Sequence, residues 1–193
     1  MATSATPYGA RPVGTLSASG SYTGKIQHIK IASGYGTAIF YGDFVKLVAA
    51  GTIEKDTGTT ALTPIGVFVG CAYTDPNTSQ KTFAQQWTAS VAASDAVGYI
   101  ITDPYLVMQM QCDGTGAQTV LGNNVSLVQT AGSTSIGTSK NAIDVSTTVA
   151  TTATLPMRFV DFVDGPDSSV GDAYTDVLVK FNVGHQLINT TGI

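Results

Sequence analysis

The sequence predicts an all-β fold, a small antiparallel barrel or sandwich that is preceded by an extended N-terminal arm. The first observation is that only 11% of the 193 residues are Asp, Glu, Lys or Arg, against about 25% in ordinary soluble domains. Helices are usually kept soluble by Glu and Lys, whereas Thr and Ser hydrate exposed strands. The second observation is a series of short runs that alternate apolar and polar residues between Gly, Pro, Asn and Asp turns.

Size and charge limit the possible functions. A hydrophobic content of 43% suits one sizeable core. The net charge of −4 and the scattering of the nine Lys and Arg residues provide no positive field for phosphates, so we expect neither nucleic-acid nor membrane binding. No apolar stretch reaches about 18 residues, and the start of the chain lacks the pattern of a secretion signal. We therefore expect synthesis in a cytoplasm.

Residues 1–24 are predicted to form the extended arm. They are mostly Ala, Thr, Ser, Gly and Pro and show no sustained helical or strand period. Tyr8, Arg11 and Tyr22 are candidate anchors that dock the arm on a neighbouring surface, because aromatic side chains give a large contact area at low entropic cost. An untethered terminus is the alternative.

Residues 25–112 are predicted to form a β-rich body. The hairpin between 44–48 and 52–55 turns at Ala50-Gly51, and Ile65, Val67 and Val69 share one face of a strand that glycines bend. The alternation over 105–112 marks a half-buried antiparallel strand. We expect strands at 25–31, 44–48, 52–55, 65–70, 83–91, 98–102 and 105–112, and one helical turn at 92–96.

Residues 113–193 are predicted to form a second β-rich half that packs on the first body or completes it. This half is more polar, and its stretch 131–154 is rich in Ser, Thr, Gly and Ala, as in a long surface excursion. The clearest strand is 174–183, which places Val177, Val179, Phe181 and Val183 on one face. Further strands are expected at 125–128, 142–145 and 155–163.

The chemical inventory predicts no enzyme and no cofactor. The sequence contains no phosphate-binding loop, nucleophile elbow or dinucleotide fingerprint. His28 and His185 have no companion histidine at metal-ligand spacing, which favours structural roles. We predict no metal site, with Asp164, Asp167 and Asp172 as weak candidates because hard cations need several oxygens from a flexible loop.

Cys71 and Cys112 leave two interpretations open. They fit no zinc spacing. Two buried thiols suit cytoplasmic synthesis, and a disulfide suits a particle that is later exposed to an oxidising environment.

Four segments of the chain resemble small structural proteins of tailed bacteriophages that are identified as head decoration, or cement, proteins. These segments are 5–13 (ATPYGARPV), 36–46 (GTAIFYGDFVK), 63–71 (TPIGVFVGC) and 150–159 (ATTATLPMRF). Their order along the chain is distinctive, and together they extend over most of it.

The resemblance implies a virion protein that binds the outer surface of the assembled head and stabilises contacts between capsomers of the major capsid protein. It also implies a homo-oligomer, a trimer being common among such proteins, that assembles in the bacterial host cytoplasm. Tyr8, Arg11 and Tyr22 are then expected to grip the capsid. The alternative is a tail or fibre component that binds a host receptor or glycan, which would carry a cluster of aromatic and carboxylate side chains on exposed loops; Trp87 is the only tryptophan of the chain.

Overall fold

A computed structural model of the protein describes residues 4–18, 20–22, 25–190 and 192–193. The chain folds into two six-stranded antiparallel sheets, which confirms the all-β prediction. A 3-10 turn, η2 (Gln118–Val120), precedes β9. The first sheet has the order β1 (Arg11–Thr15), β8 (Leu106–Gln111), β12 (Asp176–Phe181), β11 (Met157–Phe162), β9 (Asn124–Val128) and β10 (Ala142–Asp144). The second has the order β2 (Ile26–Lys30), β7 (Val97–Ile101), β5 (Gly66–Thr74), β3 (Phe44–Leu47) and β4 (Ile53–Lys55), with β6 (Lys81–Ala84) paired to β5.

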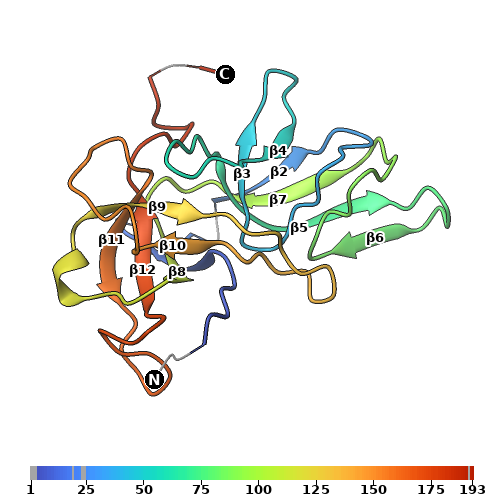
Figure 1. Ribbon diagram of the computed structural model, residues 1–193. Coiled ribbons are helices and arrows are strands. Elements are labelled where there is room, and N and C mark those ends of the chain that lie inside the picture. The colour runs from blue at the N-terminus through green and yellow to red at the C-terminus, as the bar shows by residue number, and fades with distance from the viewer. Residues whose placement is uncertain (1–3, 19, 23–24, 191) are drawn as a thin grey trace.

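Each sheet curls so that one edge strand approaches the far side of the same sheet, β10 meeting the chain at the end of β8 and β4 meeting the chain at the end of β2. In the first sheet, Cys112 follows β8 and forms a parallel bridge with Ile143 of β10. In the second, Ile31 follows β2 and forms a parallel bridge with Ile53 of β4. The two sheets lie side by side and pack together as in a sandwich (Figure 1). The sequence predicts either a barrel or a sandwich. The structure has two sheets that pack together as in a sandwich, and each sheet curls toward a barrel.

Two hydrophobic clusters hold these sheets. The larger one contains the inner face of β8, β11 and β12, and Phe44 and Val67 enter it from the second sheet. Phe44 meets Phe181 edge to face, with 5.7 Å between ring centroids. The smaller cluster surrounds Trp87 and Phe68 inside the second sheet, and both side chains are fully buried. Because the larger cluster takes residues from both sheets, they share one core.

The division between the sheets differs from the predicted boundary at residues 112 and 113. The chain passes from the second sheet to the first between β7 and β8, where Leu106 N donates to the Asp103 carbonyl at 3.1 Å. The strand β8 pairs with β1 and β12, so it belongs with residues 113–193 rather than 25–112. The alternation of residues predicts that β8 is a strand, but the sheet to which it belongs is known only from its pairing with β1 and β12.

Three local predictions need correction. The strand β5 runs to Thr74 and is buried on both faces, because Val67 points into the larger cluster and Phe68 into the smaller. Its bulge shifts the register between Phe68 and Gly70 and leaves Val69 only partly buried. Residues 92–96 form turns and no helix, and the run 83–91 is a strand only as far as Ala84.

The predicted extended N-terminal arm is not what the described N-terminal residues form. Arg11–Thr15 is an edge strand that pairs with β8, and Ala10 is fully buried. Ala10 N donates to the carbonyl of Gly42 in the second sheet's β2–β3 connection at 3.0 Å. The described part of residues 1–24 is therefore built into both sheets, while 1–3, 19 and 23–24 lie outside the described residues.

The C-terminal segment joins the sheets from the opposite end of the chain. Gln186 follows β12, and its side-chain amide pairs with the backbone of Leu47 in β3, accepting from N at 2.7 Å and donating to O at 2.9 Å. Gln186 N also donates to the Pro64 carbonyl at 2.9 Å. No helix within the described residues is long and apolar enough to cross a membrane.

Candidate functional site

The predicted anchors Tyr8 and Arg11 come together at the start of β1. The Arg11 guanidinium carbon lies 3.9 Å from the centroid of the Tyr8 ring. Burial raises the pKa of the Tyr8 hydroxyl, and the nearby Asp176 carboxylate raises it further. Neither Tyr8 Oη nor Asp176 Oδ1 has a partner at good hydrogen-bonding geometry, so the two groups interact loosely. Tyr8 thus lies against its own chain, and Arg11 stays exposed above it.

Tyr22 lies elsewhere and also contacts its own chain. Its hydroxyl donates to the Pro12 carbonyl in β1 at 3.3 Å, and its ring packs against the larger cluster. The first described residues are fixed in a similar way, because Thr6 N donates to Gln111 Oε1 at 2.8 Å. Of the three predicted anchors, only Arg11 has its side chain largely free for another molecule.

A groove of about 500 Å³ borders this pair of anchors. One wall is the N-terminal segment from Ala5 to Arg11, and the other wall is the loop that carries Ile136 and Lys140. Ile136 is 65% exposed, although it is large and aliphatic. Sequence reasoning missed Ile136 and Lys140. The available signal was a single large aliphatic residue inside a stretch of Ser, Thr and Gly.

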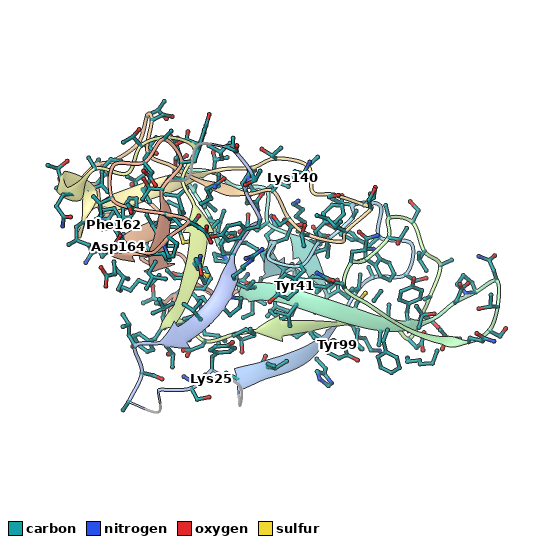
Figure 2. The ribbon with its side chains drawn as sticks, turned by 90° about the horizontal axis from the view of Figure 1, so that it is seen from below. Lys25, Tyr41, Tyr99, Lys140, Phe162 and Asp164 are labelled. Carbon is teal, nitrogen blue, oxygen red and sulfur yellow. The ribbon has the colours of Figure 1, made fainter. Side chains whose placement is uncertain are left out.

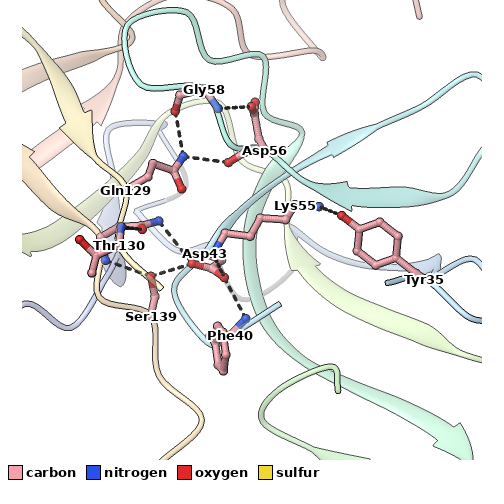
Figure 3. Close-up of polar contacts among 10 residues, drawn as sticks. Tyr35, Phe40, Asp43, Lys55, Asp56, Gly58, Gln129, Thr130 and Ser139 are labelled. Atoms are coloured by element: carbon pink, nitrogen blue, oxygen red, sulfur yellow. Dashed lines mark hydrogen bonds and ion pairs between the residues drawn. The ribbon is translucent and has the colours of Figure 1, made fainter. Parts of the chain in front are cut away.

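A buried polar cluster next to the groove holds the two sheets in register (Figure 3). Asp43 is fully buried and forms an ion pair with Lys55 Nζ at 2.9 Å. Its other oxygen accepts from Ser139 Oγ at 2.7 Å, and Phe40 N donates to the first at 2.9 Å. Nearby, Gln129 Nε2 donates to two carbonyls of the second sheet, at 2.8 Å each (Figure 3). Because each carboxylate oxygen has partners, the pair fixes the loop that carries Lys140 instead of offering a reactive group.

Gly9 brings the N-terminal segment close to this cluster. Its φ of +74° is in the left-handed region, and a Cβ there would overlap the Ser139 side chain. Only glycine fits such a position without strain.

Exposed apolar side chains gather at the edge of the first sheet. Leu16 N donates to the Tyr105 carbonyl at 3.0 Å, which places these residues opposite each other at the end of the β1–β8 pair. Leu16 is 55% exposed, Tyr105 is 50% exposed, and Val13 in the β1 bulge is 49% exposed. We call Val13, Leu16 and Tyr105 the β1-edge patch.

The described residues contain no group of three His, Cys, Asp or Glu side chains that is arranged to hold a metal ion. The weak candidates Asp164 and Asp167 are exposed, and Asp172 accepts from Ser169 N at 3.0 Å. His28 is exposed and meets the Tyr99 ring edge to face, with 4.6 Å between ring centroids.

His185 is fully buried, 5.0 Å from the Phe181 ring. Both cysteines are free and buried, Cys71 in the smaller cluster and Cys112 in the larger. Burial raises the pKa of the Cys71 thiol to about 12 and also raises that of Cys112. The two thiols are therefore weak nucleophiles at neutral pH.

Comparison with protein-family models, with curated proteins and with solved structures finds no match to this chain. Function is therefore inferred from the residues, their geometry and the resemblance of the four segments.

Proposed function

We propose that this chain is a structural protein of a tailed-bacteriophage particle, one that binds the outer surface of the assembled head. The observation that carries the proposal is the β1-edge patch, where Val13, Leu16 and Tyr105 are about half exposed. Contiguous exposed apolar residues commonly mark a protein contact. The centres of protein interfaces are also depleted in charge, which suits a chain with only 11% charged residues.

The proposed mechanism is stabilisation by selective binding. A protein that binds neighbouring capsomers only when they are assembled favours the assembled state by mass action. Many copies on one shell add their effects, because each head offers many equivalent sites. This mechanism needs a rigid body with a contact surface, and the segments that carry β1 and Gln186 are both fixed to the sheets by hydrogen bonds with the strand backbone.

The test compares binding of purified variants to heads that lack this protein. We expect the double variant Leu16→Ser with Tyr105→Ser to co-sediment with heads much less than the wild type does. Phe83→Ser is the matched control, because Phe83 is 73% exposed but lies on β6 of the other sheet. Thermal melts establish that each variant is folded. Equal binding of the patch variant and the wild type would show that this patch is not the contact.

Deletion of residues 1–24 is not a clean test, since it removes β1 from the first sheet and Ala10 from its buried position. Imaging of intact particles provides the independent test, and we expect density for the chain on the head surface. Density on the tail would overturn the proposal in favour of the receptor-binding alternative. In that alternative Trp87 could not serve as a sugar platform, because it is fully buried and donates from Nε1 to the Tyr35 carbonyl at 3.2 Å.

A further inference from the structure

The groove beside Tyr8 is cationic in a chain that is acidic overall. Arg11 and Lys140 border it, and neither forms an ion pair with another described residue. Lys25, Lys55 and Lys81 pair with aspartates, which partly neutralises their charges. The groove therefore presents two positive side chains on opposite walls that have no direct ion-pair partner among the described residues, and Arg11 also interacts electrostatically with the nearby Asp176 carboxylate.

The groove is also preorganised. The Arg11 guanidinium stacks on the Tyr8 ring at 3.9 Å, which fixes its plane and leaves its N–H edges for an acceptor. A planar guanidinium held in this way suits a carboxylate, with which it forms two parallel hydrogen bonds. Ile136 lies on a turn closed by a hydrogen bond from Gly137 N to the Ser133 carbonyl at 2.8 Å. The groove thus combines fixed cations with a fixed aliphatic side chain.

The same chain carries a segment with the complementary chemistry. Asp161 is exposed near the end of β11, and Asp164 and Asp167 are exposed on the connection from β11 to β12; we call residues 161–170 the acidic turn. Asp164 and Asp167 form no ion pair with another described residue. Val170 is 39% exposed at the end of this segment. Asp164 and Lys140 lie on separate parts of the molecule, so the turn does not reach its own groove (Figure 2).

We propose that the groove of one copy binds the acidic turn of a second copy of this chain. The contact joins two different surfaces, so repetition of it produces a closed ring or an open chain. Exposed ion pairs contribute little affinity, so the charges mainly set the register while Ile136 and Val170 supply apolar contact. The association therefore weakens as salt concentration rises.

Two variants with complementary defects test the contact by sedimentation velocity. Lys140→Glu damages only the groove, and Asp164→Asn with Asp167→Asn damages only the acidic turn. We expect each variant alone to associate about tenfold more weakly than the wild type. Mixed together, they retain one intact contact, between the groove of the turn variant and the turn of the groove variant. The mixture is therefore expected to form a one-to-one dimer and nothing larger.

Lys30→Glu is the control, because it changes the net charge as Lys140→Glu does and Lys30 is also exposed. We expect it to associate like the wild type. Any of three results would overturn the proposal: the wild type stays monomeric over the concentration range, the Lys140→Glu variant associates normally, or the mixture does not dimerise. Binding of the groove only to acidic segments of another protein would overturn it as well. The experiment needs no heads, so its outcome is separate from that of the head-binding assay.

Discussion

Protonation of His185 is expected to destabilise the fold in mild acid. The imidazole is fully buried beside Phe181, where the first sheet meets the C-terminal segment. Its Nδ1 accepts from Leu187 N at 3.3 Å, and Nε2 has no hydrogen-bond partner among the described residues. A second proton would therefore place a charge in an apolar environment with little solvation. Burial lowers the pKa of His185 from 6.5 to about 4, although the Asp103 carboxylate acts in the opposite direction.

The magnitude follows from proton linkage. Between about pH 4 and pH 6.5 the unfolded chain binds a proton at His185 and the folded chain does not. The unfolded state then binds more protons, so the free energy of unfolding rises with pH in this window. The contribution is fully present above pH 6.5 and is lost as pH falls toward 4. At 1.36 kcal/mol per pKa unit, the loss is about 3 kcal/mol.

The assay is urea unfolding of the wild type and of His185→Asn at several pH values between 4 and 7, followed by Trp87 fluorescence. Asparagine keeps an acceptor near Leu187 N but does not titrate. Asp176, whose pKa burial raises, contributes with the opposite sign and is present in both proteins. We expect the wild type to lose about 3 kcal/mol more than the variant on acidification. Equal losses in the two proteins would refute the assignment to His185.

Two other predictions concern the join between the sheets, and a third concerns the smaller cluster. Gly9→Ala should lower the free energy of unfolding by at least about 2 kcal/mol, because the added methyl group overlaps a neighbouring side chain and the backbone is strained as well. Gly34→Ala is the control, because Gly34 has a similar φ of +73° but open space around it. Thermal melts of both variants should show a smaller loss of stability for Gly34→Ala. Asp43→Ala should lower the free energy of unfolding, measured in urea, by about 3–5 kcal/mol, because it leaves the Lys55 ammonium without its carboxylate. Lys55→Met should lower it less, because three hydrogen bonds to Asp43 remain. A larger loss for Lys55→Met than for Asp43→Ala would contradict the role of the cluster. Trp87 fluorescence should resist acrylamide quenching in the folded protein, since the indole is fully buried, and strong quenching without denaturant would show that the smaller cluster is open.

Strands with a regular alternation could be predicted from the sequence. In β8, Leu106, Met108 and Met110 are fully buried on the face that meets the larger cluster, and Val107, Gln109 and Gln111 lie on the opposite face, outside that cluster. In β12, Val177 and Val179 are buried in the same way. These predictions succeed because one face of each strand meets the core and the other does not, which the period of 2 reports directly.

The partners of these strands could not be predicted, because pairing depends on contacts between distant parts of the chain. Nothing local distinguishes Arg11–Thr15 from the rest of a Ser- and Gly-rich segment, yet Arg11 pairs with Gln109 in the first sheet. The face assignment of β5 failed for a related reason. A strand buried on both sides gives no alternation, and the bulge between Phe68 and Gly70 shifts its period.

The candidate site was predicted in part. Tyr8 and Arg11 were singled out as the large side chains of a polar segment, and the structure brings them together. Their partners across the groove, Ile136 and Lys140, come from a loop more than a hundred residues later in the sequence. The loop reaches the groove because Tyr41 N donates to the Gly137 carbonyl at 3.0 Å, a contact that sequence pattern does not encode.

The surface of the protein carries even less charge than its composition indicates, because several aspartates are buried. Asp43, Asp56, Asp103 and Asp144 are all buried, where they accept hydrogen bonds or pair with lysines. The exposed surface is therefore poorer in free charge than the composition indicates. On such a surface the few exposed charged groups have a large share in the local field. The groove and the acidic turn are two such places of opposite sign, and the proposed contact would bring them together even though both copies carry net negative charge.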